Sequence, residues 1–186
     1  MTFDSKEELE KIQTYYKDAK KVLRIAVDDS QSVCKFNSKF GAFDDQIAEI
    51  FQHIQETGDD IYGVSFHVGS GCQDPQIHKN AILSALEIMQ KGRKLGMTMK
   101  LLDIGGGYPA SDRYIKFTDI TRHIREVYDT LGERYPELRD IQWIGEPGRY
   151  MVGTSHTLVT EVIGKKKKVD GSERVYITEG LYSCLS

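Results

Sequence analysis

Apolar residues recur at helical spacing in four segments of the chain, and each segment predicts a helix with one buried side. In the clearest of them Ile47, Ile50, Phe51 and Ile54 are three or four residues apart, and Gly58 follows as a stop. The other starts carry capping signals, such as the S-x-x-E pattern after Asp4. The predicted helices begin near Ser5, span residues 44–57 and 74–94, and run from Phe117 to about Arg134.

Short apolar runs lie between these helices and predict buried strands. They cover Lys21–Val27, Ile61–Val68, Met97–Ile104 and Ile141–Gly145, with a possible fifth strand in the first residues. Strand starts recur roughly every forty residues with one helix between them, which is typical of βα units and a parallel sheet. A (β/α)8 barrel and an open doubly wound sheet both fit this pattern, but four or five strands cannot close an eight-stranded barrel.

The pattern changes after Arg149, where β segments follow one another without a helix. They are predicted at Thr157–Gly164, Lys165–Val169 and Arg174–Ile177, with a turn at residues 170–172. We therefore expect a boundary between an α/β domain and a β domain near residues 153–160.

Composition and charge exclude several classes of protein. The 25 Lys and Arg against 28 Asp and Glu give a net charge of −3, which argues against a nucleic-acid or anionic-membrane surface, and the four lysines at 165–168 are interpreted as a solvated strand end. No apolar run reaches the roughly 18–20 residues of a membrane span, and the first residues do not resemble a signal peptide. The three cysteines form no CxxC pair, so neither a disulfide framework nor a metal site is predicted. We expect a cytoplasmic protein.

Polar and glycine-rich residues follow the ends of the predicted strands, which is the edge where parallel α/β folds bind ligands. Glycine lets backbone N–H groups approach an anion closely, although a glycine triplet also fits a tight turn. A histidine in an apolar run can equally be a core residue, and a carboxylate before proline a turn residue. With neither a GxxxxGK nor a GxGxxG motif, the set suits a flat, charged, phosphorylated cofactor. Its members are Arg24, His67, Ser70, Gly105–Gly107, Glu146, Gly148 and Arg149.

Three motifs carry a specific resemblance. Ser65–Cys72 reads SFHVGSGC, Leu102–Gly107 reads LDIGGG and Gly145–Tyr150 reads GEPGRY. Together they resemble the eukaryotic ornithine decarboxylases, and the similarity runs along the whole chain in order. That family depends on pyridoxal 5'-phosphate and joins an alanine-racemase-like (β/α)8 barrel to a β domain. The resemblance implies that residues 1–153 are the later part of the barrel and residues 154–186 the start of the β domain.

The resemblance also assigns roles. His67 is expected to stack on the pyridine ring, Glu146 to pair with the ring nitrogen, and Arg24 to organise the other edge of the ring. Lys39 resembles a position at the dimer interface of the family. The cofactor phosphate is expected to contact Ser70, Gly105, Gly106, Gly107 and Gly148, with Arg149 nearby.

Two parts of the family pattern are missing from these residues. The Schiff-base lysine lies upstream of the matched segment in the family, and the cysteine that protonates the product lies downstream. We therefore assign no catalytic residue, interpret the chain as an internal piece of the enzyme, and expect it to be inactive alone. Glu179 departs from the aspartate that receives the distal amine of the substrate in the family, and so is the candidate substrate-binding residue.

For the complete chain, the resemblance predicts decarboxylation of L-ornithine to putrescine, in polyamine biosynthesis, by a homodimer. It also makes antizyme a candidate partner. A catalytically inactive relative that resembles antizyme inhibitor is the alternative from another functional class. A decarboxylase of another basic amino acid is a further alternative. The residues expected to contact the cofactor match the active pattern and favour the enzyme, whereas Glu179 favours the alternatives.

Overall fold

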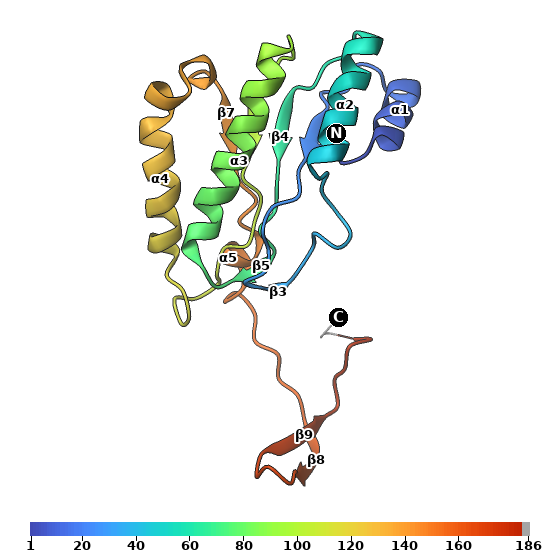
Figure 1. The fold of residues 1–186 in the computed structure, drawn as a ribbon. Helices are drawn as coiled ribbons and strands as arrows, with labels where there is room; N and C mark the ends of the chain where they lie inside the picture. The colour runs from blue at the N-terminus through green and yellow to red at the C-terminus, as the bar shows by residue number, and fades with distance from the viewer. Residues whose placement is uncertain (184–186) are drawn as a thin grey trace. The chain divides into compact units, whose positions relative to one another are not determined.

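The computed structural model describes residues 1–183 and forms two compact units that divide after Gly153 (Figure 1). The first unit contains a five-stranded sheet in which every neighbouring pair is parallel. The chain order of the strands is also their spatial order, as in successive units of a barrel. The strands are β1 (Thr2–Phe3), β2 (Val22–Arg24), β4 (Gly63–Ser65), β6 (Leu101–Asp103) and β7 (Gln142–Ile144).

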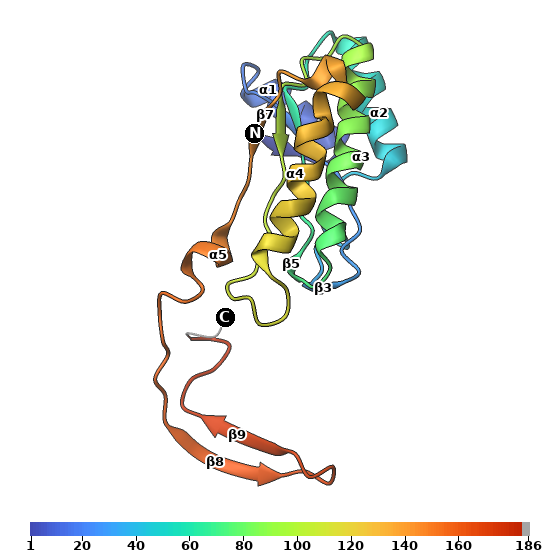
Figure 2. The same ribbon diagram turned by 90° about the vertical axis from the view of Figure 1, so that its left-hand side faces the viewer.

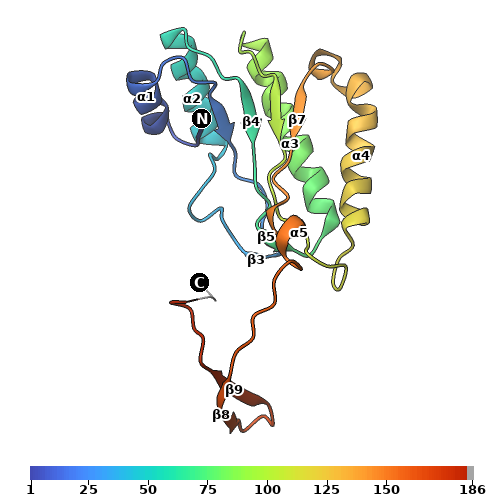
Figure 3. The same cartoon turned by 180° about the vertical axis from the view of Figure 1, so that it is seen from behind.

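The helices lie where their apolar spacing predicts them. Figures 2 and 3 show α2, α3 and α4 together on one face of the sheet, as expected for a barrel segment and not for a doubly wound sheet. The Ser5 hydroxyl accepts from the Glu8 N–H, and Gly58 ends α2 in a left-handed conformation with φ 66°. The helices are α1 (Lys6–Tyr15), α2 (Asp44–Thr57), α3 (Pro75–Lys94), α4 (Phe117–Arg134), the 3-10 helix η1 (Pro136–Leu138) and α5 (Gly148–Val152).

The register of the sheet places a row of core side chains on one face and a largely polar row on the other. Leu23, Val64 and Leu102 are partners in register, and all three are completely buried in the hydrophobic core. Side chains alternate between the faces of a sheet, so the next row projects to the opposite face. That row consists of Arg24, Ser65, Asp103 and Ile144.

The strands are shorter than predicted. The expected strand Lys21–Val27 is reduced to Val22–Arg24, followed by an isolated parallel bridge between Ile25 and Ala42, and the other three are also reduced to three residues. The apolar residues on either side are buried without ladder pairing, so their pattern reports burial more than strand length.

Two features of the first unit were not predicted. β3 (Ser32–Cys34) pairs antiparallel with β5 (Ser70–Cys72), where the sequence indicated only a glycine-rich loop. Gly69 and Gly71 have φ angles of 91° and 70°, which bend the chain on both sides of Ser70. The short helix α5 also forms where the sequence indicated a turn.

The second unit contains the hairpin of β8 (Val162–Lys167) and β9 (Glu173–Ile177). Two predicted strands, Thr157–Gly164 and Lys165–Val169, are therefore one strand that begins later than expected. The predicted turn is confirmed, because Gly171 has φ 80° and the Asp170 side chain accepts from the Ser172 N–H. Cys34 and Cys72 are free thiols, whereas Cys184 lies outside the described residues.

Candidate functional site

The polar row at the ends of the strands brings an arginine and two carboxyl groups together. The register aligns Arg24 with Ser65 and Asp103, and Glu146 follows β7 at the same edge. Burial raises the pKa of Asp103, and partial burial together with the negative charge of Asp103 raises the pKa of Glu146. Arg24 opposes both shifts, and a hydrogen bond between the carboxyl groups favours the proton on Glu146. The site can therefore hold a proton or pair with a cation at Glu146.

We predict that Asp103→Asn stabilises the first unit at neutral pH. Because the pKa of Asp103 is raised in the folded state, the stabilisation from its protonated form is present below its ordinary value of 3.8 and is lost as pH rises through the folded value. Asparagine keeps the acceptor for the Gly105 N–H, which Asp103 Oδ1 holds at 2.9 Å. Urea unfolding at several pH values from below 3.8 up to neutral pH should show the gain growing as pH rises above 3.8, and a gain that falls as pH rises would contradict the assignment.

His67 lies beside this cluster, with its Nε2 facing Gly106. Its Nδ1 accepts from the Gly69 N–H at 2.9 Å, which places the ring proton on Nε2. Burial and the charge of Arg24 lower the pKa of His67, so the ring is neutral at pH 7. Phe36 contacts the ring edge-on, with the centroids 5.0 Å apart. His67 is only partly buried, so it is not the core residue that its apolar neighbours allowed.

The glycine triplet forms a turn packed directly on the neighbouring strand ends. Gly105 and Gly107 have φ angles of 60° and 98°. A Cβ at Gly105 would lie 2.0 Å from the Phe66 carbonyl oxygen, so no larger side chain fits. The N–H groups of Gly106 and Gly107 have no acceptor among residues 1–183. The turn therefore holds two free backbone N–H donors at positions where a residue with a Cβ would collide with neighbouring atoms.

Ser70 and Arg149 are brought together beside this turn, although they are 79 residues apart in the chain. Arg149 Nη2 donates to Ser70 Oγ at 2.9 Å, and a Cβ at Gly107 would lie 2.7 Å from the carbonyl oxygen of Gly69, which precedes Ser70. Gly148 has open space around it. A guanidinium, a hydroxyl and free N–H groups form a donor set that fits a phosphate ester.

The structure thus brings together the residues predicted in the first unit, whereas Glu179 lies in the second. Ser183 Oγ donates a hydrogen bond to Glu179 Oε2. Lys39 is exposed, with Nζ 6.0 Å from the centroid of Phe40. Glu179 and Lys39 keep their roles as predictions.

Sequence reasoning missed Asp103 as the partner of Glu146, and also missed Phe36 beside His67. The signal for Asp103 was present, because this carboxylate lies one residue before the end of the predicted buried run Met97–Ile104. Ser65 is buried and its hydroxyl has no hydrogen-bond partner within the described part of the chain.

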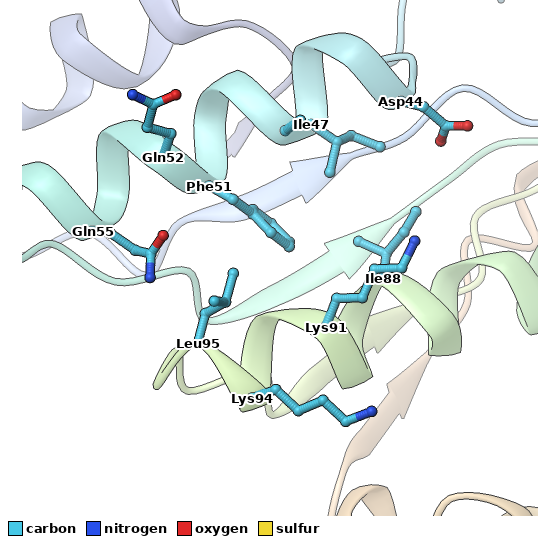
Figure 4. A pocket seen from close by; sticks show the side chains of 10 residues that line it. Asp44, Ile47, Phe51, Gln52, Gln55, Ile88, Lys91, Lys94 and Leu95 are labelled. Carbon is cyan, nitrogen blue, oxygen red and sulfur yellow. The ribbon is translucent and has the colours of Figure 1, made fainter.

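A separate groove of about 590 Å³ lies between α2 and α3 (Figure 4). Phe51 from α2, Ile88 from α3 and Leu95, which directly follows α3, line it, with Lys91 and Lys94 also on the α3 side. None of the predicted site residues contributes to it. The groove therefore lacks the carboxyl groups, imidazole and glycine turn found at the strand ends.

The chain is similar to known proteins over most of its length. Residues 1–153 match the family described as pyridoxal-dependent decarboxylase, pyridoxal binding domain. Ornithine decarboxylase of Rattus norvegicus is 40% identical over 196 residues, which cover 98% of this chain and 42% of the rat protein. Antizyme inhibitor 2 of Xenopus laevis is 40% identical over 168 residues, which cover 90% of this chain and 36% of the Xenopus protein. The chain thus spans less than half the length of these relatives.

Solved structures give the same result. Arginine decarboxylase of Paramecium bursaria Chlorella virus, bound to agmatine, superposes with a TM-score of 0.78 at 34% identity, covering 96% of this chain and 47% of the viral one. Lysine decarboxylase from Selenomonas ruminantium superposes with a TM-score of 0.73 at 32% identity. The superposition covers 99% of this chain and 47% of the Selenomonas chain. These structures confirm the predicted α/β class and the barrel origin of the sheet. No helix in the described residues is long and apolar enough to cross a membrane.

The match of residues 1–153 to the family model shows that the chain belongs to the pyridoxal-dependent decarboxylase family.

Proposed function

We propose that this chain carries the pyridoxal phosphate site of an ornithine decarboxylase. The observation that carries the proposal is that two clusters of polar residues lie at the same edge of the sheet. One is the cluster of Arg24, His67 and Glu146, and the other is the pair of Ser70 and Arg149 beside the glycine turn. A mutant of the related SrLDC has been solved in complex with PLP, which supports the same cofactor here.

Each residue in the proposed site has a physical task. Ser70, Arg149 and the free N–H groups of the turn bind the phosphate, which fixes the position of the ring. His67 supplies a neutral, flat face for stacking, and Glu146 pairs with a protonated ring nitrogen. When bound, the cofactor supplies an electron sink for the pair released as carbon dioxide leaves. Arg24 balances the charge of the two carboxyl groups at the ring edge.

The finer parts of the proposal concern the whole protein. We propose ornithine as the substrate, a homodimer with Lys39 near its interface, regulation by antizyme, and residues 154–186 as the beginning of a β domain. A cytoplasmic location stays a prediction. An inactive relative of the antizyme-inhibitor type is the second candidate, because the Xenopus protein is as similar as the rat enzyme and Glu179 departs from the family pattern.

A chimera separates these candidates. Residues 1–186 replace the matching segment of the rat enzyme, and carbon dioxide release is measured from ornithine, lysine and arginine. We expect turnover of ornithine by the chimera and none by residues 1–186 alone, because a five-stranded sheet is an incomplete barrel. Restoring the shorter carboxylate with Glu179→Asp should raise kcat/KM for ornithine by about tenfold, the effect of one methylene in a fitted site.

The unmodified rat enzyme is the control for assembly. A dimeric chimera that binds antizyme but turns over none of the three substrates would favour the inactive relative. Turnover by residues 1–186 alone would overturn the prediction that the isolated chain is inactive. A preference for lysine or arginine that Glu179→Asp does not change would overturn the role of Glu179 in substrate choice.

A further inference from the structure

Four aromatic rings form a continuous series beside the proposed phosphate site. His78 stacks on Tyr108 with centroids 5.2 Å apart and planes at 26°, and Tyr108 meets Phe117 edge-on at 5.8 Å. Phe117 stacks on Tyr150 at 4.1 Å and 24°. We call His78, Tyr108, Phe117 and Tyr150 the aromatic ladder. Its members come from α3, the segment after β6, α4 and α5, so four separate elements contribute one ring each.

The two ends of the ladder lie against the two turns that supply the phosphate donors. Tyr108 directly follows Gly107, and a Cβ at Gly107 would lie 3.7 Å from His78 Nε2. At the other end, Tyr150 directly follows Arg149. One backbone hydrogen bond also joins the turns, from the Glu146 N–H to the Gly105 carbonyl at 2.8 Å. The ladder therefore connects the same two turns through side chains.

The rings are suited to packing more than to acid–base chemistry. His78 is completely buried, and its ring lies against the backbone of Gly106 in the turn. Burial lowers the pKa of His78 to about 4, so the ring stacks in its neutral form. Burial, with the charges of Asp103 and Glu146, raises the pKa of Tyr108, which keeps its hydroxyl protonated. Stacked and edge-on ring contacts favour fixed relative orientations.

We propose that the aromatic ladder positions the Gly105–Gly107 turn relative to Arg149, and so sets the preference of the site for a phosphorylated ligand. The inference rests on the proposed function for the ligand but on the ring contacts for the positioning. Phe117 is the central link, since it contacts both Tyr108 and Tyr150. The four residues are positioning residues, and none is assigned a contact with the cofactor.

The test cuts the ladder at Phe117 in residues 1–186. Phe117→Ala removes the central ring, and Phe117→Tyr restores a ring of the same shape. Tyr128→Ala is the matched control, because Tyr128 is also on α4 and makes an edge-on ring contact with Trp143 at 5.5 Å, outside the ladder. Tyr150→Leu removes the ring at the other end of the ladder, where the Tyr150 residue is 41% exposed. This variant keeps the test possible if Phe117→Ala fails to fold.

Two readouts are needed. Hydrogen exchange at the Glu146 amide, measured by NMR, reports the junction between the turns, and the Leu102 amide reports the core. Spectroscopic titration with pyridoxal 5'-phosphate and with pyridoxal gives the preference for the phosphate. We expect Phe117→Ala and Tyr150→Leu to speed exchange at Glu146 and to reduce that preference, each by about tenfold, with Phe117→Tyr and Tyr128→Ala unchanged.

Unchanged exchange at Glu146 in both ladder variants would overturn the proposal. So would equal acceleration at Leu102, which would make Phe117 and Tyr150 ordinary contributors to stability. If the unmodified chain binds both ligands equally or binds neither, the proposed phosphate site fails instead, and the exchange rates alone decide whether the ladder positions the turns.

Discussion

Replacing Gly105 with alanine is expected to destabilise the first unit by about 2–4 kcal/mol and to abolish binding of pyridoxal phosphate. The new Cβ would lie 2.0 Å from the Phe66 carbonyl oxygen and 3.1 Å from the carbonyl carbon, so backbone must move. The φ of 60° adds strain for any residue with a Cβ. Movement of the turn would also displace the free N–H groups of Gly106 and Gly107. Urea unfolding and spectroscopic titration measure the two effects separately.

Gly132→Ala is the matched control for this substitution. Gly132 lies inside α4, and a Cβ there would meet no atom within 4 Å. Alanine is the better helix former, so this variant should be more stable by about 1 kcal/mol and should bind as the unmodified chain does. Equal stability and equal binding for Gly105→Ala would show that the turn is not packed against the end of β4 as described.

The helices were largely predictable because their signals are local. The spacing of Ile47, Ile50, Phe51 and Ile54 together with Gly58 gave both bounds of α2. The same holds for α3, whose predicted span of residues 74–94 agrees with Pro75–Lys94, and Asp74 caps this helix by accepting from the Gln76 N–H. Capping and amphipathic spacing act within a few residues, so one sequence contains the whole signal.

The features that the sequence did not predict depend on contacts between residues far apart in the chain. β3 and β5 are three residues each and are 35 residues apart, so neither has a pattern of its own. The hydrogen bond between Arg149 and Ser70 follows from the positions of two loops, which no local spacing encodes. Asp103 was visible as a polar strand end, but its pairing with Glu146 required the register of the sheet. Register is set by packing between elements, and only the structure reveals it.

Glu146→Gln in the rat chimera is expected to lower kcat/KM for ornithine on the order of 10²-fold or more, because it removes one fixed charge from the proposed site. Glutamine keeps the shape and the hydrogen-bonding capacity of the side chain beside Asp103. It cannot carry the negative charge that would hold a proton on the ring nitrogen of the cofactor. Carbon dioxide release measures the loss, and titration with pyridoxal phosphate measures how far cofactor binding also weakens.

The position of Glu146 makes this result specific to charge. Asp103 remains in the variant, where its Oδ1 accepts from the Gly105 N–H at 2.9 Å, so the substitution removes the charge of Glu146 alone. Glu133→Gln provides the control, because Glu133 is exposed on α4 and loses the same charge away from the strand ends. Activity of Glu146→Gln within about threefold of the unmodified chimera would mean that the ring nitrogen needs no charged partner here, and would remove Glu146 from the proposed site.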